Sequence, residues 1–154
     1  MPVEIRPATK EDLPGAIGVN VQTLPEHYIE KFWSDTLATF PALFYVAKDG
    51  DNVVGYIMGN LFQTLHQGRL ITAANVASVA VLSSYRNRGI ATSLLNEFYR
   101  GAKSLGLTFA ALQVRFSNVN AKQLYDHQGF ETIHTIPNYY SNGESAYLML
   151  RLLQ

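Results

Sequence analysis

The sequence predicts an α/β domain in which a mixed sheet carries helices on its faces. Apolar, β-branched segments typical of strands alternate along the chain with segments whose apolar residues recur at helical spacing. The chain has 154 residues, of which 47% are hydrophobic and 16% are charged, as in an ordinary globular protein. We find no linker and no internal repeat, so we expect a single domain over residues 1–154.

Strands are expected where apolar residues run between turn-forming residues. In chain order these strands span residues 3–6, 43–48, 53–62, 70–81, 108–114, 131–136 and 146–152. Residues 49–52 read Asp-Gly-Asp-Asn and predict the hairpin turn between the second and third strands. A polar loop over residues 137–144 joins the last two strands.

Two helices are expected before the first hairpin. Thr9 and Asp12 form a weak capping box, and the buried stripe of the first helix is expected to be Leu13, Ile17 and Val21. Pro25 biases Leu24 away from helical geometry, so the first helix ends there. The second helix follows and carries one apolar face, made of Tyr28, Ile29, Phe32, Trp33 and Leu37.

Two further helices are expected in the second half of the chain. The third begins at Gly89 and ends at Gly106, with Ile90, Leu94, Leu95, Phe98 and Ala102 along one face. The fourth is short, capped by Asn120 and ended by Gly129.

The charge balance and the residue types exclude several functional classes. Twelve basic and twelve acidic residues leave no net charge that would attract nucleic acid or a membrane surface. The chain has no cysteine, which excludes disulfides, thiolate catalysis and cysteine-ligated metals, and its four histidines lack the paired spacing of a metal site. No signal segment or membrane-length apolar run is visible, so we expect a cytoplasmic protein.

Residues 86–92 predict an anion-binding turn. Here a strand passes through a loop into a helix, and the start of a helix exposes unpaired N–H groups at the positive end of its dipole. Gly89 and Ala91 are small, so the backbone can approach a phosphate closely, while Arg86 and Arg88 add positive charge. Taken alone, the pattern also fits a plain strand-to-helix loop with a glycine in its first turn.

Two segments of the chain resemble sequence elements of the GNAT superfamily of acetyltransferases. The first is Ser78-Val79-Ala80-Val81 followed by Tyr85-Arg86-Asn87-Arg88-Gly89-Ile90-Ala91-Thr92. The second reads Val114-Arg115-Phe116-Ser117-Asn118, then Ala121, Leu124-Tyr125 and Gly129-Phe130, and is similar to the family element Asn-x-x-Ala-x-x-x-Tyr-x-x-x-Gly-Phe. The resemblance implies the GNAT fold, with a mostly antiparallel sheet of six to seven strands and about four helices.

The resemblance also implies acetyl-CoA as cosubstrate, without a metal. The backbone of Val79, Ala80 and Val81 would pair with the pantetheine arm as an extra strand does. The pyrophosphate would lie against Arg86, Asn87, Arg88, Gly89, Ile90, Ala91 and Thr92, and the Asn118 amide would hydrogen-bond the cofactor. Tyr125 matches the general acid, since a phenol with a pKa of about 10 is protonated at pH 7 and can donate to the leaving thiolate. Without the family match, Asn118 also fits a helix-start residue and Tyr125 a core tyrosine.

The acceptor end resembles one branch of this superfamily, the N-alpha-acetyltransferases, which includes the NatA-type catalytic subunit, its archaeal relatives and the RimI group. The similar segments are Leu24-Pro25-Glu26-His27-Tyr28 and Tyr139-Tyr140. The resemblance implies that two loops close over a protein N-terminus, with Glu26 binding or polarising near the α-amine and Tyr139 bonding the peptide backbone. Leu24, Pro25 and Tyr28 would complete the acceptor site, and a homodimer or an auxiliary subunit is possible in this branch.

Two positions depart from the branch. Where its members often carry a histidine or tyrosine and a glutamate or histidine, this chain has Asn75 and Gln113. An amide cannot accept a proton near neutral pH, although it can orient a water. An α-amine has a pKa of about 8 and needs roughly 1 kcal/mol to reach its neutral form at pH 7, whereas a lysine needs about 4.6 kcal/mol. A site without a strong base therefore favours α-amines, with protons leaving through water held by Asn75, Gln113 and Glu26.

Two other functions remain open from the sequence. A GNAT enzyme acting on lysine side chains or on a small-molecule amine has the same cofactor elements. The amides at positions 75 and 113 also fit a non-catalytic acyl-CoA-binding protein, whereas Tyr125 and the intact turn favour an enzyme.

Overall fold

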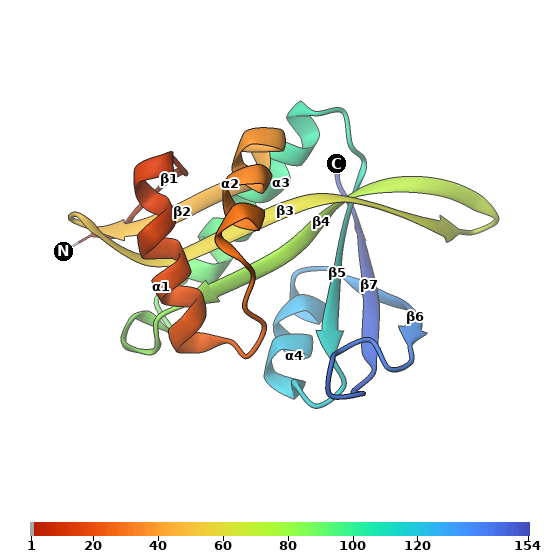
Figure 1. Cartoon of the computed structure of the whole chain (residues 1–154). Coiled ribbons are helices and arrows are strands. Elements are labelled where there is room, and N and C mark those ends of the chain that lie inside the picture. The colour runs from red at the N-terminus through yellow and green to blue at the C-terminus, as the bar shows by residue number, and fades with distance from the viewer. Residues whose placement is uncertain (1) are drawn as a thin grey trace.

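A seven-stranded mixed sheet runs through the computed structural model, which describes residues 2–154 (Figure 1). The strands are β1 (Glu4–Pro7), β2 (Phe44–Asp49), β3 (Asn52–His66), β4 (Arg69–Val81), β5 (Phe109–Arg115), β6 (Glu131–Ile136) and β7 (Ala146–Leu152). The helices are α1 (Leu13–Thr23), α2 (Glu30–Thr39), α3 (Ile90–Ser104) and α4 (Val119–His127). The strand order is β1-β2-β3-β4-β5-β7-β6, and β4 and β5 form the parallel pair within this sheet. The expected fold class is confirmed.

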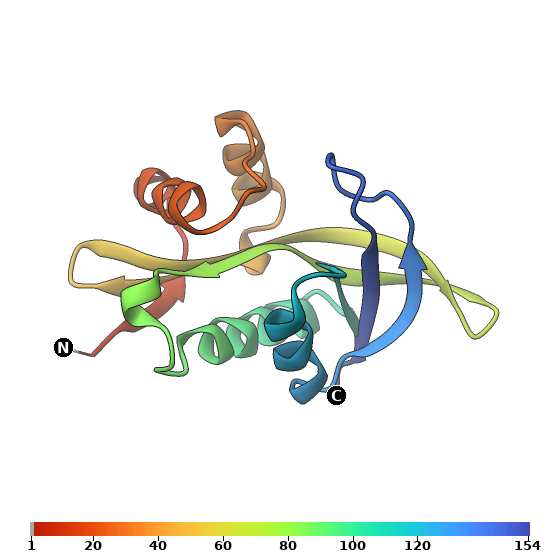
Figure 2. The same cartoon turned by 90° about the horizontal axis from the view of Figure 1, so that it is seen from below.

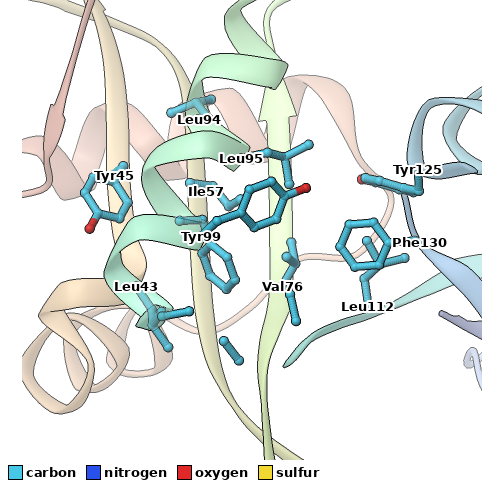
Figure 3. Packing of buried hydrophobic residues seen from close by; sticks show 14 of the residues in the cluster. Leu43, Tyr45, Ile57, Val76, Leu94, Leu95, Tyr99, Leu112, Tyr125 and Phe130 are labelled. Atoms are coloured by element: carbon cyan, nitrogen blue, oxygen red, sulfur yellow. The ribbon is translucent and has the colours of Figure 1, made fainter. Parts of the chain in front are cut away.

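The helices cover both faces of the sheet. Figure 2 shows α1 and α2 on one face and α3 and α4 on the other. On the α3 face, Leu94, Leu95 and Phe98 pack in one buried cluster with strand residues such as Ile57 and Val76 (Figure 3). On the opposite face, the core is built around Trp33, Phe44, Tyr56 and Met58. Burial of these large side chains, rather than local helix propensity, stabilises the arrangement.

The buried stripe of α1 differs from the expected one. Leu13 is buried as predicted, but Ile17 is only partly buried and Val21 is 56% exposed. The helix turns a different face to the sheet because Gly15 lies against β3, where a Cβ would stand only 2.7 Å from Cγ2 of Val53. Ala16, Val19 and Asn20 are buried in place of Val21. Nδ2 of Asn20 donates two hydrogen bonds there, whereas its Oδ1 has no hydrogen-bond partner among residues 2–154.

Two helix starts also differ from prediction. Tyr28 and Ile29 precede α2 instead of lying on its face, and Ile29 is 74% exposed. The N-cap of α4 is Asn118 rather than Asn120, and its Oδ1 accepts a hydrogen bond of 3.1 Å from the N–H of Ala121. Capping by Asn118 starts the helix two residues earlier than the predicted cap would.

The hairpin of β3 and β4 is longer than predicted. The expected end of the third strand at Phe62 falls short, since β3 continues to His66 and pairs with β4 as far as Arg69. Gln67 and Gly68 both adopt positive φ in the turn, the backbone geometry of a tight two-residue hairpin loop. The last two strands begin and end at the predicted residues.

Candidate active site

A gap between β4 and β5 is the central feature of the candidate site. The two strands pair only from Ala74 to Val76 with Ala110 to Leu112, and beyond that point they diverge (Figure 1). A bulge at Ala77, opposite the Met58–Gly59 step of β3, marks the end of this short parallel seam. The end of β4 therefore presents backbone groups without a partner strand on the β5 side, an edge that can pair with an extended ligand.

A cleft of about 670 Å³ opens from this gap on the α3 and α4 side. It is lined by the end of β4, by the loop before α3 and by the start of α4. All the residues predicted to bind the cofactor line this cleft except Arg88: Val79, Ala80, Val81, Arg86, Asn87, Gly89, Ile90, Ala91, Thr92, Asn118 and Tyr125. Arg88 instead donates to the carbonyl of Ser84 at 3.2 Å and lies over the ring of Tyr85.

The turn before α3 has the backbone geometry of an anion site. Asn87 and Gly89 adopt φ values of 62° and 76°, and Gly89 is the N-cap of α3 without a side-chain cap. The first amides of the helix therefore depend on a ligand or solvent for their hydrogen bonds. A Cβ on Gly89 would meet no protein atom within 4 Å, so here the positive φ, not crowding by the protein, is what favours glycine.

This geometry predicts that Gly89→Ala weakens acetyl-CoA binding about tenfold and lowers stability by about 1–2 kcal/mol, since a left-handed conformation disfavours alanine. Gly50→Ala is the matched control, because Gly50 has a similar φ of 61° in an open turn outside the cleft. Both variants are expected to lose similar stability in thermal denaturation. Calorimetric titration with acetyl-CoA should separate them, and equal affinities for the two variants would contradict a binding role for the turn.

Tyr125 lies where the cleft meets a second, smaller cavity. Its side chain is 8% exposed and packs edge-on against Phe130, with ring centroids 5.9 Å apart. Figure 3 shows its hydroxyl pointing away from α4, toward the space between α3 and β4. Burial, with a smaller contribution from Tyr99, raises the pKa of Tyr125 above that of a free phenol. The hydroxyl is therefore a permanent donor near neutral pH.

The smaller cavity, of about 190 Å³, lies among the loops that the sequence assigned to the acceptor. Of the predicted acceptor residues, Leu24, Glu26, Tyr28, Gln113 and Tyr139 line it. Figure 2 shows the β6–β7 loop rising on the α1 and α2 side of the sheet, opposite the side of α3 and α4. The gap between β4 and β5 thus connects two spaces on opposite faces of the sheet.

The remaining predicted acceptor residues, Pro25 and Asn75, do not line the cavity. Pro25 is exposed in the loop. Asn75 is buried behind Gln113, which donates from Nε2 to its Oδ1 at 2.9 Å, and Asn75 in turn donates to Oδ1 of Asn60 at 3.1 Å. The two amides at the positions where the branch often carries a base therefore form, together with Asn60, a hydrogen-bonded ladder across β5, β4 and β3.

Tyr28 fixes the acceptor loop to β4. Its hydroxyl donates to the backbone carbonyl of Ala77, the bulged residue, at 3.2 Å. Burial first, and then the nearby Tyr56 and Glu26, raise the pKa of Tyr28 to about 12, so this donor also persists at neutral pH. The contact holds the loop beside the gap.

Arg115 is a site residue that the sequence reasoning did not select. Its guanidinium donates from Nε to Glu26 at 2.9 Å, with a second bond to the same carboxylate, and from Nη1 to Glu144 at 2.9 Å. It also stacks on the ring of Tyr140 at 3.9 Å. Desolvation acts against its charge, but the bonds to Glu26 and Glu144 raise the pKa of Arg115 overall. Strand alternation offered a signal, since Arg115 follows Gln113 by two residues and shares its face.

Glu144 completes this link from the other loop. Hydrogen bonds from Ser117 and from Arg115 lower the pKa of Glu144, and the backbone N–H of Ser117 donates to it at 2.7 Å. Arg115 therefore ties the α1–α2 loop, through Glu26, to the β6–β7 loop, through Glu144. The Glu26 carboxylate, predicted to act near the amine, is already engaged by a guanidinium.

None of the helices among residues 2–154 is both long and apolar enough to span a membrane.

Comparisons with known proteins agree with this geometry. The model of the acetyltransferase (GNAT) family matches residues 6–130. An N-alpha-acetyltransferase of Saccharolobus solfataricus is 37% identical over 154 residues, covering 97% of this chain and 92% of that protein. The crystal structure of Ard1 from Thermoplasma volcanium superposes with a TM-score of 0.88 at 25% identity, covering 100% of this chain and 99% of that one.

A third relative was solved with a ligand. Naa50 of Arabidopsis thaliana, in complex with the bisubstrate analogue CoA-Ac-MVNAL, superposes with a TM-score of 0.80 at 25% identity, covering 98% of this chain and 99% of that one. The match of the family model over most of the chain and the identity to the archaeal relative lead to one conclusion. The chain belongs to the GNAT family of acetyltransferases.

Proposed function

We propose that this protein transfers the acetyl group of acetyl-CoA to the α-amino group of protein N-termini. The observation that carries the proposal is the gap between β4 and β5, through which a phosphate-binding cleft meets a cavity enclosed by two loops. The name of the S. solfataricus relative, and the CoA–peptide analogue bound to Naa50, support this combination of substrates.

The cleft supplies the groups that acetyl-CoA requires. The edge of β4 at Val79 to Val81 pairs with the amides of the pantetheine arm, although the Val81 carbonyl already accepts from Nε of Arg86 at 3.2 Å. The unpaired N–H groups at the start of α3 receive the pyrophosphate. Arg86 lies at the same opening and adds positive charge. The side-chain oxygen of Asn118 caps α4, which leaves its amide NH₂ group to donate to the cofactor. Together these contacts place the thioester at the gap.

Transfer follows from this placement. The neutral α-amine attacks the thioester carbonyl carbon, so that the C–N bond forms and the C–S bond breaks. Tyr125 donates its hydroxyl proton to the departing sulfur and then regains a proton from water; its raised pKa keeps the phenol protonated between turnovers. The amine loses its extra proton to water on the acceptor side. Holding the two reactants in this geometry supplies much of the rate enhancement.

The acceptor side favours an amine that is easily neutralised. The ladder of Gln113, Asn75 and Asn60 offers amides and no base. Reaching the neutral form at pH 7 needs about 1 kcal/mol for an α-amine and about 4.6 kcal/mol for a lysine, a difference of more than a hundredfold in reactive amine. Glu26, whose charge is balanced by Arg115, lines this cavity and accepts a hydrogen bond from the amine, and Tyr139 bonds the peptide backbone.

The proposal is tested with two peptides of equal length. One has a free α-amine and no lysine, and the other has a blocked α-amine and a single lysine. At pH 7 we expect kcat/KM to be at least about a hundredfold higher for the free α-amine. It should rise with pH with a midpoint at about pH 8 and reach a plateau at about pH 9, as the substrate amine titrates. Initial rates of thiol release, with mass spectrometry of the acetylated site, provide the measurement.

The competing functions give different results in the same assay. Faster acetylation of the blocked peptide would identify a lysine acetyltransferase. Binding of acetyl-CoA without thiol release for either peptide would identify a non-catalytic acyl-CoA-binding protein.

A further inference from the structure

A chain of buried polar side chains runs beneath the acceptor loop and has no part in the mechanism described above. It consists of Asn20 on α1, Tyr56 on β3 and Ser78 on β4, which are 1%, 0% and 8% exposed. Nδ2 of Asn20 donates to the backbone carbonyl of Glu26 and to the hydroxyl of Tyr56, both at 3.0 Å. The hydroxyl of Tyr56 lies 2.6 Å from Oγ of Ser78.

The hydrogen bonds of this chain of polar side chains run in one direction, from Asn20 toward Ser78. The carbonyl of Glu26 can only accept, so the group of Asn20 that faces it must be the NH₂. The same nitrogen faces Tyr56, so the Tyr56 oxygen accepts from Asn20. The Tyr56–Ser78 distance fits a hydrogen bond in either direction, but among the described residues Ser78 is the one acceptor within reach of the Tyr56 hydrogen, so we assign that hydrogen to Ser78. Because the Ser78 oxygen is thereby an acceptor, its hydroxyl hydrogen is left for another partner.

Ser78 lies where such a partner would enter. It lines the smaller cavity together with Glu26 and Gln113. It also stands between the bulged Ala77 and Val79, the first residue of the strand segment that borders the cofactor cleft. Both reactants bring a carbonyl oxygen to this point, the acetyl-CoA through its thioester and the peptide through its first residue.

We propose that Asn20 and Tyr56 are positioning residues that present the Ser78 hydroxyl as a hydrogen-bond donor to a reactant carbonyl oxygen at the gap. The inference rests on the proposed function, because it requires both reactants to meet beside Ser78. The same chain of polar side chains also fixes the acceptor loop, since Asn20 donates to the backbone carbonyl of Glu26. Burial raises the pKa of Tyr56, so its hydroxyl retains the hydrogen that it gives to Ser78.

Steady-state kinetics of Ser78→Ala and Tyr56→Phe in the full chain tests the proposal and identifies the carbonyl. If Ser78 donates to the thioester, Ser78→Ala should lower kcat about tenfold with little change in the KM for the peptide. If it donates to the peptide, the KM for the peptide should rise about tenfold at a similar kcat. In that case a substrate with a methylene in place of the first carbonyl should have the same KM with Ser78→Ala as with the wild type. In either case Tyr56→Phe should shift the same parameter by a smaller factor, because it disturbs only the orientation of Ser78.

Tyr45→Phe is the matched control for the loss of a buried tyrosine hydroxyl. Tyr45 donates to the carbonyl of Ala42 at 2.8 Å on the other face of the sheet, away from both cavities. Melting temperatures of all variants, measured in parallel, separate misfolding from a change in the site.

Two results would overturn the inference. One is an active wild-type enzyme whose kcat and KM are unchanged, within about twofold, in Ser78→Ala. The other is a Tyr56→Phe variant that behaves like Tyr45→Phe. A wild-type protein that acetylates no α-amine would instead overturn the proposed function, and this inference with it.

Discussion

Replacing Tyr125 with phenylalanine is expected to lower kcat about a hundredfold while leaving acetyl-CoA binding nearly unchanged. The ring packing against Phe130 survives the change, so only the hydroxyl is lost. General acid assistance is commonly worth about 10²–10⁴-fold, and the lower end applies here because a thiol with a pKa of about 8.5 is a fair leaving group. Thiol release measured at saturating peptide, with calorimetry for acetyl-CoA, provides both quantities.

The pH profile of the wild-type rate gives a second expectation about Tyr125. Since burial raises the pKa of Tyr125, deprotonation of this acid should not limit the wild-type rate below about pH 10. Tyr99→Phe is the matched control, because Tyr99 is also a buried tyrosine of the α3-face core but lines neither cavity of the candidate site. Similar kcat values for Tyr125→Phe and Tyr99→Phe would remove Tyr125 from the chemistry.

Replacing Arg115 with alanine is expected to lower kcat/KM for the peptide about thirtyfold to a hundredfold, mainly through KM. The change leaves the carboxylates of Glu26 and Glu144 without their shared cation, so the two acceptor loops repel each other instead of being linked. Losing one partner of a buried charge pair costs about 2–5 kcal/mol, and the lower part of this range applies because the Arg115 and Glu26 side chains are 17% and 31% exposed. The affinity for acetyl-CoA should change little, because Arg115 does not line the cofactor cleft.

A double-mutant cycle isolates the contact responsible. If Arg115 acts by holding Glu26, Arg115→Ala should cost much less in a Glu26→Gln background than in the wild type. Arg115→Lys keeps the charge but cannot bond both carboxylates at once, so its kcat/KM for the peptide should lie between those of the wild type and Arg115→Ala. Additive effects of Arg115→Ala and Glu26→Gln would contradict the link.

The cofactor half of the site was accessible from the sequence because it depends on local geometry. A strand, a glycine at a helix start and two arginines lie within a few residues of one another, and the structure places this segment in one cleft. The exception, Arg88, turns toward Ser84 and Tyr85, a choice that depends on the fold of its own loop. The roles of these residues remain predictions until the variants are measured.

The acceptor half was less accessible because it depends on contacts between distant segments. Glu26 and Arg115 lie 89 positions apart, and only the folded sheet brings them together. Asn75 was placed correctly on its strand, but the sequence could not show that Gln113 packs against Asn75 and separates it from the cavity. Likewise, the periodicity of α1 favoured Val21 over Asn20, because apolar spacing carries no information about a buried amide whose Nδ2 donates two hydrogen bonds to distant segments.

The short seam between β4 and β5 has a consequence for the mechanics of the whole molecule. Strands β1 to β4 and strands β5 to β7 form two halves of the sheet, joined edge to edge by three residue pairs. A ligand in the cleft would contact β4 in one half and the α4 region, which follows β5, in the other, and so link the two halves. We therefore expect bound acetyl-CoA to make the protein more rigid and to raise its melting temperature.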